Sequence, residues 1–148
     1  MKTACILFMV LTVLLVGCAS RDHISTQTET DNESGEEIEM RLSIGGTAVP
    51  VTWESNASVE ALKNLCPLTI QMSMYGGFEQ VGSIGQSIVR NDRQTDTHYG
   101  DIVLYSGNQI VIFYGSNSWA YTRLGHVNLS QQEMRNLLGN GDVSITLK

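Results

Sequence analysis

The side chains best suited to form a binding surface are aromatic residues and methionines. Aromatic rings and thioethers make adaptable apolar surfaces, although any one of these residues has a place in the core as its alternative. Trp119 is the most suggestive, because it follows a Gly-Ser-Asn-Ser stretch that is typical of a loop. The residues predicted to line a candidate groove are Met72, Met74, Tyr75, Tyr114, Trp119, Tyr121 and Arg123.

Residue types and spacing indicate no catalytic or metal-ligating set. A metal site needs three or four converging ligands, which His98 and His126 do not supply. We find no defensible Ser-His-Asp order, no glycine-rich phosphate loop and no carboxylate pair placed for acid–base chemistry. We therefore expect no metal and no cofactor, and catalytic residues stay unassigned. For Arg123 we expect a structural ion pair, with Asp101 as its candidate partner, and a ligand-facing cation is the alternative.

An apolar run covers Ala4 to Val16, with Lys2 before it. A positive start, an apolar stretch of this length and small residues after it are typical of a secretory signal peptide. The run is shorter than the roughly 20 residues that a membrane-spanning helix needs. It ends in Leu-Val-Gly-Cys at residues 15–18, which resembles a bacterial lipobox.

The lipobox resemblance implies cleavage before Cys18 and lipid, usually including palmitate, on that cysteine. Two or more acyl chains give a stable anchor, whereas one binds a membrane only marginally. We expect an extracytoplasmic protein of the bacterial cell envelope that is held to a membrane by this lipid. Because Ala19 and Ser20 follow instead of Asp, a Gram-negative cell would place it at the outer membrane. The alternative is an ordinary cleavable signal peptide with an incidental cysteine.

The segment after Cys18 differs in composition from the rest of the chain. Residues 19–37 hold six acidic residues against one arginine, and too few apolar side chains to offset the entropy of ordering them. We therefore predict a signal peptide over 1–17, a lipidated cysteine with a disordered acidic tether over 18–37, and a folded domain over 38–148. The domain has seven basic and nine acidic residues without a basic patch, which argues against nucleic acid as a partner.

Alternation of apolar and polar residues predicts a mainly β domain. Gly45-Gly46 is a hairpin signal, and Pro50 indicates an edge position. Residues 83–97 are polar and are expected to be irregular. The expected strands cover residues 38–44, 47–53, 68–74, 78–81, 102–105, 110–114, 119–127 and 143–147.

Two short helices are expected between these strands. Residues 57–65 follow an N-cap signal at Ser55-Asn56 and place three apolar side chains on one face. Residues 131–138 follow Ser130, and Glu133 stands where a capping box requires an acid or amide. Short strands with two short helices suggest a closed or nearly closed β-barrel, because closure removes exposed sheet edges.

The order of these elements resembles the bacterial cyclophilin-like domain family. The resemblance rests on segments 100–105, 110–115 and 121–127, on the opening hairpin, helix and Pro67–Ile70, and on the closing segment 141–146. It covers almost all of residues 38–148. It implies a closed barrel of about eight strands with two short capping helices, and we expect that domain to be monomeric.

Cyclophilins proper are peptidyl-prolyl isomerases that use a positioned arginine and an apolar proline pocket. Their pattern places Phe five and Gln eight residues after that arginine. Here Gly46 stands five residues after Arg41, and Thr95 stands five after Arg90. The isomerase residues therefore cannot be assigned in this chain.

The functional expectation is a non-catalytic module that binds a peptide or a small ligand outside the cytoplasm. The alternative is a divergent prolyl isomerase that acts on exported proteins, whose folding slow prolyl isomerisation can limit. That alternative requires Arg90, Arg93 or Arg123 to face an apolar pocket.

Overall fold

The computed structural model describes residues 39–148, within the compact unit Glu37–Lys148. The predicted signal peptide (1–17), the lipidated Cys18 and the acidic tether (18–37) lie outside the described residues.

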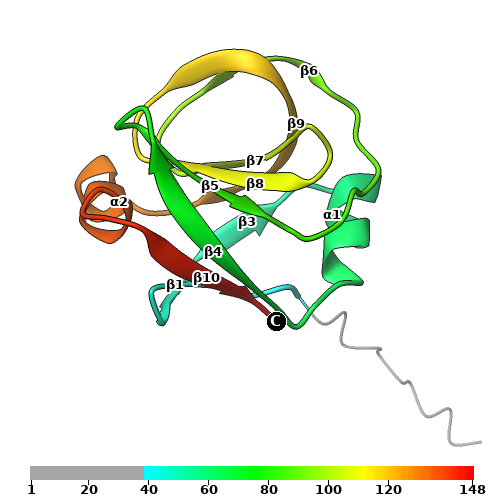
Figure 1. The fold of residues 1–148 in the computed structure, drawn as a ribbon, viewed down its shortest axis with the longest axis horizontal. Helices are drawn as coiled ribbons and strands as arrows, with labels where there is room; N and C mark the ends of the chain where they lie inside the picture. Colours follow the sequence, from blue (N-terminus) through cyan, green and yellow to red (C-terminus); the bar gives the residue numbers. More distant parts are fainter. Residues whose placement is uncertain (1–38) are drawn as a thin grey trace, which may run out of the picture. The chain divides into compact units, whose positions relative to one another are not determined.

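Ten strands and two helices form the described part of the chain (Figure 1). The strands are β1 (Leu42–Ile44), β2 (Thr47–Val49), β3 (Val51–Trp53), β4 (Leu68–Tyr75), β5 (Glu79–Ser83), β6 (Arg93–Thr97), β7 (Asp101–Tyr105), β8 (Gln109–Phe113), β9 (Asn117–Val127) and β10 (Val143–Leu147). The helices are α1 (Ala57–Lys63) and α2 (Gln131–Leu138). The expectation of a mainly β barrel with two short helices is confirmed.

Hydrogen bonds join the strands in the order β2-β1-β10-β4-β5-β8-β7-β9-β3, and β6 adds to β9. The two ends of this path, β2 and β3, are neighbours in sequence on either side of Pro50. The barrel therefore nearly closes through that residue. Pro50 has no amide hydrogen to give to a ladder, but its carbonyl accepts a bond of 2.8 Å from the amide of Asn128.

The strand count exceeds the expected eight or so for two reasons. Pro50 divides the strand expected over 47–53 into β2 and β3. The prediction that residues 83–97 are irregular was wrong for 93–97, which form β6. That strand shows no apolar alternation because its two buried side chains, Thr95 and Thr97, are polar. The Thr97 hydroxyl donates a hydrogen bond of 2.9 Å to the carbonyl of Asn117.

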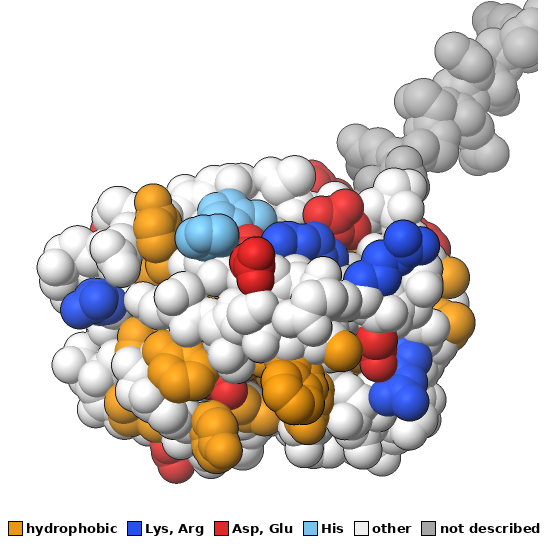
Figure 2. Space-filling model, turned by 90° about the horizontal axis from the view of Figure 1, so that it is seen from above, with side chains coloured by type: hydrophobic (Ala, Val, Ile, Leu, Met, Phe, Trp, Pro, Cys, Tyr) orange, Lys and Arg blue, Asp and Glu red, His pale blue; other side chains and the backbone are white. Residues whose placement is uncertain are grey.

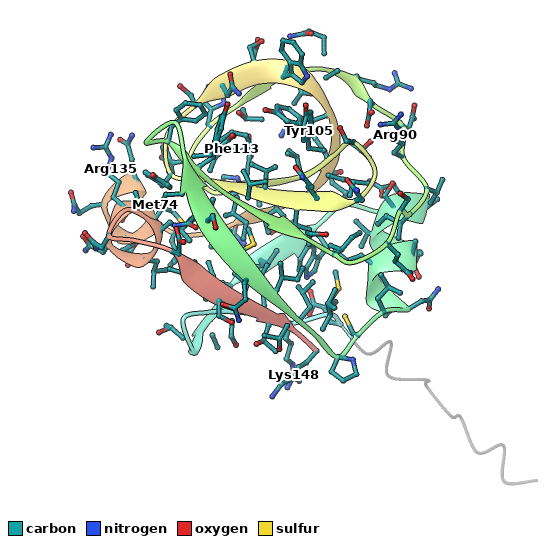
Figure 3. The ribbon with its side chains drawn as sticks, in the orientation of Figure 1. Met74, Arg90, Tyr105, Phe113, Arg135 and Lys148 are labelled. Carbon is teal, nitrogen blue, oxygen red and sulfur yellow. The ribbon has the colours of Figure 1, made fainter. Side chains whose placement is uncertain are left out.

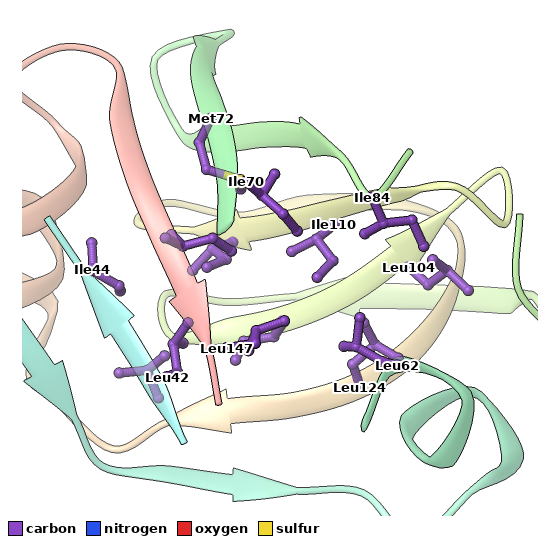
Figure 4. Packing of buried hydrophobic residues seen from close by; sticks show 14 of the residues in the cluster. Leu42, Ile44, Leu62, Ile70, Met72, Ile84, Leu104, Ile110, Leu124 and Leu147 are labelled. Carbon is purple, nitrogen blue, oxygen red and sulfur yellow. The ribbon is translucent and has the colours of Figure 1, made fainter. Parts of the chain in front are cut away.

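The main core fills the barrel interior (Figure 4). Ile102 and Leu104 of β7 and Ile110 and Ile112 of β8 point into it and are almost fully buried. The helices contribute Leu62, Met134 and Leu138 to this core, each fully buried. In Figure 1 the helices lie on opposite sides of the barrel.

The intervening residues of β7 and β8 face the other way and are also buried. Val103, Val111 and Phe113 form a second apolar cluster with Tyr121 of β9. β9 reaches this position because its first half pairs with β6 and its second half with β7 and β3, with a register shift near Val103. Figure 1 shows β9 curving over β7 and β8 as a broad arch, so these two strands are covered on both faces.

Both helices begin at the capping residues that the sequence indicates. The Asn56 side chain accepts a hydrogen bond of 3.0 Å from the amide of Val59. Ser130 and Glu133 form the predicted capping box. Hydrogen bonds from the Ser130 hydroxyl and amide to the Glu133 carboxylate hold the pKa of that carboxyl below its usual value.

The contribution of α2 to the barrel can be tested at its last turn. Leu138→Ala empties a fully buried site and should lower the free energy of unfolding by about 3 kcal/mol. The neighbouring Leu137 is only partly buried, so Leu137→Ala makes the same chemical change for about 1 kcal/mol. Urea unfolding measures both values. Equal losses would show that α2 does not seal the core as described.

Candidate functional site

A cavity of about 440 Å³ lies on the outer side of β5, β8 and β7, beneath the arch of β9. It is separate from the main core, because β7 and β8 lie between them. Its lining residues are Tyr75, Glu79, Val81, Tyr105, Gln109, Val111, Asn117, Trp119 and Tyr121.

The inner wall of the cavity is built from aromatic rings in edge contact. The ring of Tyr121 lies 6.0 Å from that of Tyr105 and 5.8 Å from that of Phe113, and both pairs are T-shaped. Asn117 donates a hydrogen bond of 3.0 Å from Nδ2 to the Tyr121 hydroxyl. In Figure 3, Tyr105 and Phe113 lie inside the arch of β9. These contacts fix the wall before any ligand arrives.

The mouth of the cavity exposes two large aromatic side chains. Tyr75, the last residue of β4, is 66% exposed, and Trp119 of β9 is 57% exposed. Figure 2 looks onto this side from above and shows groups of hydrophobic side chains, with an acidic side chain visible between them. Exposed aromatic groups beside a cavity are typical of binding sites.

Glu79 places a carboxyl group in the same cavity. It opens β5, lies opposite Phe113 of β8 and is only 6% exposed. Its Oε2 is buried and has no hydrogen-bond partner among the described residues. Burial raises the pKa of this carboxyl from 4.5 to about 7. The carboxyl therefore changes charge near neutral pH.

The Glu79 charge affects the pKa of two tyrosines. Burial raises the pKa of Tyr114, and the Glu79 charge raises it further. The pKa of Tyr121 is raised by burial first and by Glu79 second, and its bond from Asn117 opposes that shift. The Tyr114 hydroxyl is buried and has no hydrogen-bond partner within residues 39–148, so it does not donate a hydrogen bond to Glu79.

The structure distributes the seven predicted groove residues over several places. It brings Tyr75, Trp119 and Tyr121 together at the cavity. Met72 and Tyr114 belong to the main core and are almost fully buried. The remaining two residues, Met74 near α2 (Figure 3) and Arg123, do not line the cavity.

The prediction of an ion pair between Arg123 and Asp101 is confirmed. Arg123 Nη1 lies 3.4 Å from Asp101 Oδ2, and Nη2 donates to the carbonyl of Asp96. The same carboxylate accepts a bond of 2.9 Å from the amide of His98 and contacts His126 Nδ1 at 2.9 Å. Asp101 thereby joins the start of β7 to β9.

The other two arginines that an isomerase mechanism would require do not point into the aromatic cavity. Arg90 lies 3.3 Å from Asp92 in an exposed ion pair. Arg93 is exposed at the start of β6. Together with Arg123 they line a second depression of about 640 Å³, on the side of the molecule that carries α1.

Glu79 was not identified from the sequence. One signal exists: the apolar run of β8 predicts burial on both faces, so an acid paired with it would be buried too. That signal can be used only if the pairing of β5 with β8 is known. The sequence does not reveal this pairing, because 25 residues separate the two strands.

No group of three His, Cys, Asp or Glu side chains converges on a metal position within residues 39–148. Neither α1 nor α2 is long and apolar enough to cross a membrane.

The described residues form a β-barrel with a filled interior and a separate aromatic cavity on one side. The chain belongs to the cyclophilin-like family, whose model matches residues 42–148. The fold resembles the solution structure of the hypothetical protein AF2241 from Archaeoglobus fulgidus. The TM-score is 0.54 at 16% identity, over 74% of this chain and 92% of that one.

A partial similarity connects the chain to a transport protein. The autoinducer 2 import system permease protein LsrC of Yersinia pseudotuberculosis is 36% identical over 78 residues, which is 52% of this chain. A Yersinia pestis LsrC is 36% identical over 73 residues. The chain spans only about a fifth of the length of these permeases, so their transport role is not carried over.

The charge of Glu79 predicts a pH dependence of stability. Because the pKa is about 7 in the folded chain and near 4.5 when exposed, folding favours the protonated form. The contribution of Glu79 to the free energy of unfolding is therefore fully present below pH 4.5 and is lost as the pH rises through 7. The total loss is about 3 kcal/mol. Glu79→Gln should remove this loss.

Urea unfolding at pH 4.5 and pH 8 tests this prediction. Wild type should lose about 3 kcal/mol relative to Glu79→Gln between the two pH values. Glu39→Gln, at an exposed position, controls for the loss of one carboxylate and should follow wild type. Parallel profiles for wild type and Glu79→Gln would contradict the buried, unpaired carboxyl.

Proposed function

We propose that this chain is a lipid-anchored, extracytoplasmic binding protein, and that its cyclophilin-like domain takes a small ligand or a short peptide segment into the aromatic cavity. The observation that carries the proposal is the cavity itself, with its fixed aromatic wall and its exposed aromatic mouth. A volume of about 440 Å³ is within the range of small-molecule sites.

The strands that form the wall of the cavity are held in place by the sheet and by the main core. β5, β8 and β7 form three consecutive neighbours in the sheet, and their opposite face is anchored in the main core. The wall residues Val111 and Tyr121 are themselves buried. A ligand would therefore meet a largely preformed surface, which keeps the ordering cost of binding low.

A non-catalytic role is favoured by the arginines. Arg123 is engaged with Asp101, Arg90 with Asp92, and Arg93 is exposed. The condition that we set for a divergent isomerase was an arginine facing an apolar pocket, and none of these three lines the aromatic cavity. All three line the second depression beside α1, where ion pairs hold Arg90 and Arg123.

Binding in the cavity is tested with the uncharged dye N-phenyl-1-naphthylamine, which fluoresces in apolar sites. We expect the purified Glu37–Lys148 unit to enhance its fluorescence. Val81→Trp fills the cavity from its wall and should abolish the enhancement. Val89→Trp makes the same change at an exposed position outside the cavity and should leave it intact.

Circular dichroism confirms that both tryptophan variants are folded. Equal dye binding by wild type and the Val81→Trp variant would refute the cavity as the binding site. An absence of enhancement with wild type would count against the binding function itself.

The anchor is proposed from the sequence, namely the apolar leader and its ending in Leu-Val-Gly-Cys at residues 15–18. Because lipid attaches to the cysteine thiol, Cys18→Ser should prevent labelling by an alkyne-tagged palmitate in a bacterial host and should leave the leader uncleaved. Cys66→Ser changes the free thiol of the barrel domain and is the matched control. Labelling of the Cys18→Ser variant would contradict the anchor and leave the cavity proposal unaffected.

A further inference from the structure

We propose that the aromatic cavity selects small organic ammonium ions, that is, protonated amines with at least one N–H, over neutral or anionic molecules of the same shape. The inference rests on the proposed binding function and specifies the ligand class of that site.

The charge in the cavity points to a cation. Glu79 is the charged residue among the nine that line it, and no lysine or arginine is part of that lining. An anionic ligand would meet the carboxylate with no compensating positive charge. A ligand cation would supply the missing countercharge in a site of low solvent access.

The unpaired carboxylate oxygen defines the head group of the ligand. Oε2 of Glu79 is buried and has no donor on the described residues. A buried acceptor without a donor is unfavourable, and a charge-assisted hydrogen bond is stronger than a neutral one. An ammonium N–H satisfies this oxygen, whereas a quaternary ammonium has no hydrogen to donate.

The aromatic side chains favour the same charge. Tyr75, Tyr105, Trp119 and Tyr121 surround the space that Glu79 faces. The faces of such rings attract cations, and clusters of them are a common means of recognising organic ammonium groups. Val81 and Val111 add apolar wall, which suits an organic body attached to the ammonium group. A metal ion would need several oxygen ligands, and the cavity offers one carboxylate.

The preference should grow with pH because Glu79 must be ionised to attract the cation. The titratable groups near it on neighbouring elements are Tyr75 on β4, Tyr105 on β7 and Tyr121 on β9, which line the cavity, and Tyr114 after β8, whose side chain belongs to the main core. All four are phenols, and burial together with the Glu79 charge raises the pKa of Tyr114 and of Tyr121 above the usual value. Glu79 is therefore the group that changes the charge of the cavity in this range, and ammonium binding should strengthen from pH 6 to pH 8.

Three probes that share one phenylmethyl body separate charge from shape: benzylammonium, benzyl alcohol and phenylacetate. Isothermal titration of the full chain in nonionic detergent, with a blank titration into micelles, gives their affinities at pH 8. We expect benzylammonium to bind at least about tenfold more tightly than benzyl alcohol, and phenylacetate to bind most weakly.

The origin of the preference is tested at Glu79. Glu79→Gln should reduce the ratio between benzylammonium and benzyl alcohol to near one, while Glu39→Gln retains it. The wild-type ratio should also fall from pH 8 to pH 6, which tests the same group without a substitution.

Each contrary result has a distinct meaning. Equal affinities for benzylammonium and benzyl alcohol would overturn the ammonium inference and leave the proposed binding function standing. A preference that survives Glu79→Gln and does not change with pH would overturn the role of the carboxylate. If none of the three probes binds, the ammonium inference fails, and the neutral dye then decides whether the cavity binds ligands at all.

Discussion

The structure depends on the burial of β7 and β8 on both faces. Alternate residues of these strands fill the barrel, and the residues between them need a second apolar cover. β9 provides it by curving outward, pairing first with β6 and then with β7. The long β9 is thus both a wall of the barrel and the roof of the cavity.

This arrangement accounts for the properties of Glu79. The second apolar cluster, formed by Val103, Val111, Phe113 and Tyr121, includes no buried residue of β5. β5 places the Glu79 carboxyl opposite Phe113, and the cavity lies there. An acid in such a place loses hydration without gaining a partner, so its pKa rises to about 7. A carboxyl group whose ionisation destabilises the domain supports the binding role that we propose.

The sequence predicts much of the barrel, because its signals are local. Alternation at 143–147, the dense runs of β7 and β8, the glycine hairpin and the helix caps all depend on neighbouring residues, and the structure bears them out. β6 was not predicted because its buried side chains, Thr95 and Thr97, are polar, so the strand shows no apolar alternation. The pair of Arg123 and Asp101 was predicted from the position of the arginine within an expected strand, and the structure pairs these two residues across β7 and β9.

The residues of the cavity are harder to predict from the sequence than the strands and helices. Tyr75, Trp119 and Tyr121 were grouped on their chemical type, and the structure brings these three to one cavity. Met72 and Tyr114 share that chemistry but point to the opposite side of the sheet. Which side a residue faces depends on register and on the curvature of β9, and both arise from long-range pairing. Glu79 was missed for the same reason.

The central claim is that the Glu79 carboxyl is buried beneath the arch of β9 and has no hydrogen-bond partner in the described part of the chain. A direct measurement is the titration of its side-chain ¹³C carboxyl resonance by NMR, assigned by comparison with the Glu79→Gln variant. The account predicts a midpoint at about pH 7. A midpoint near 4.5, the value of an exposed glutamate, would contradict it.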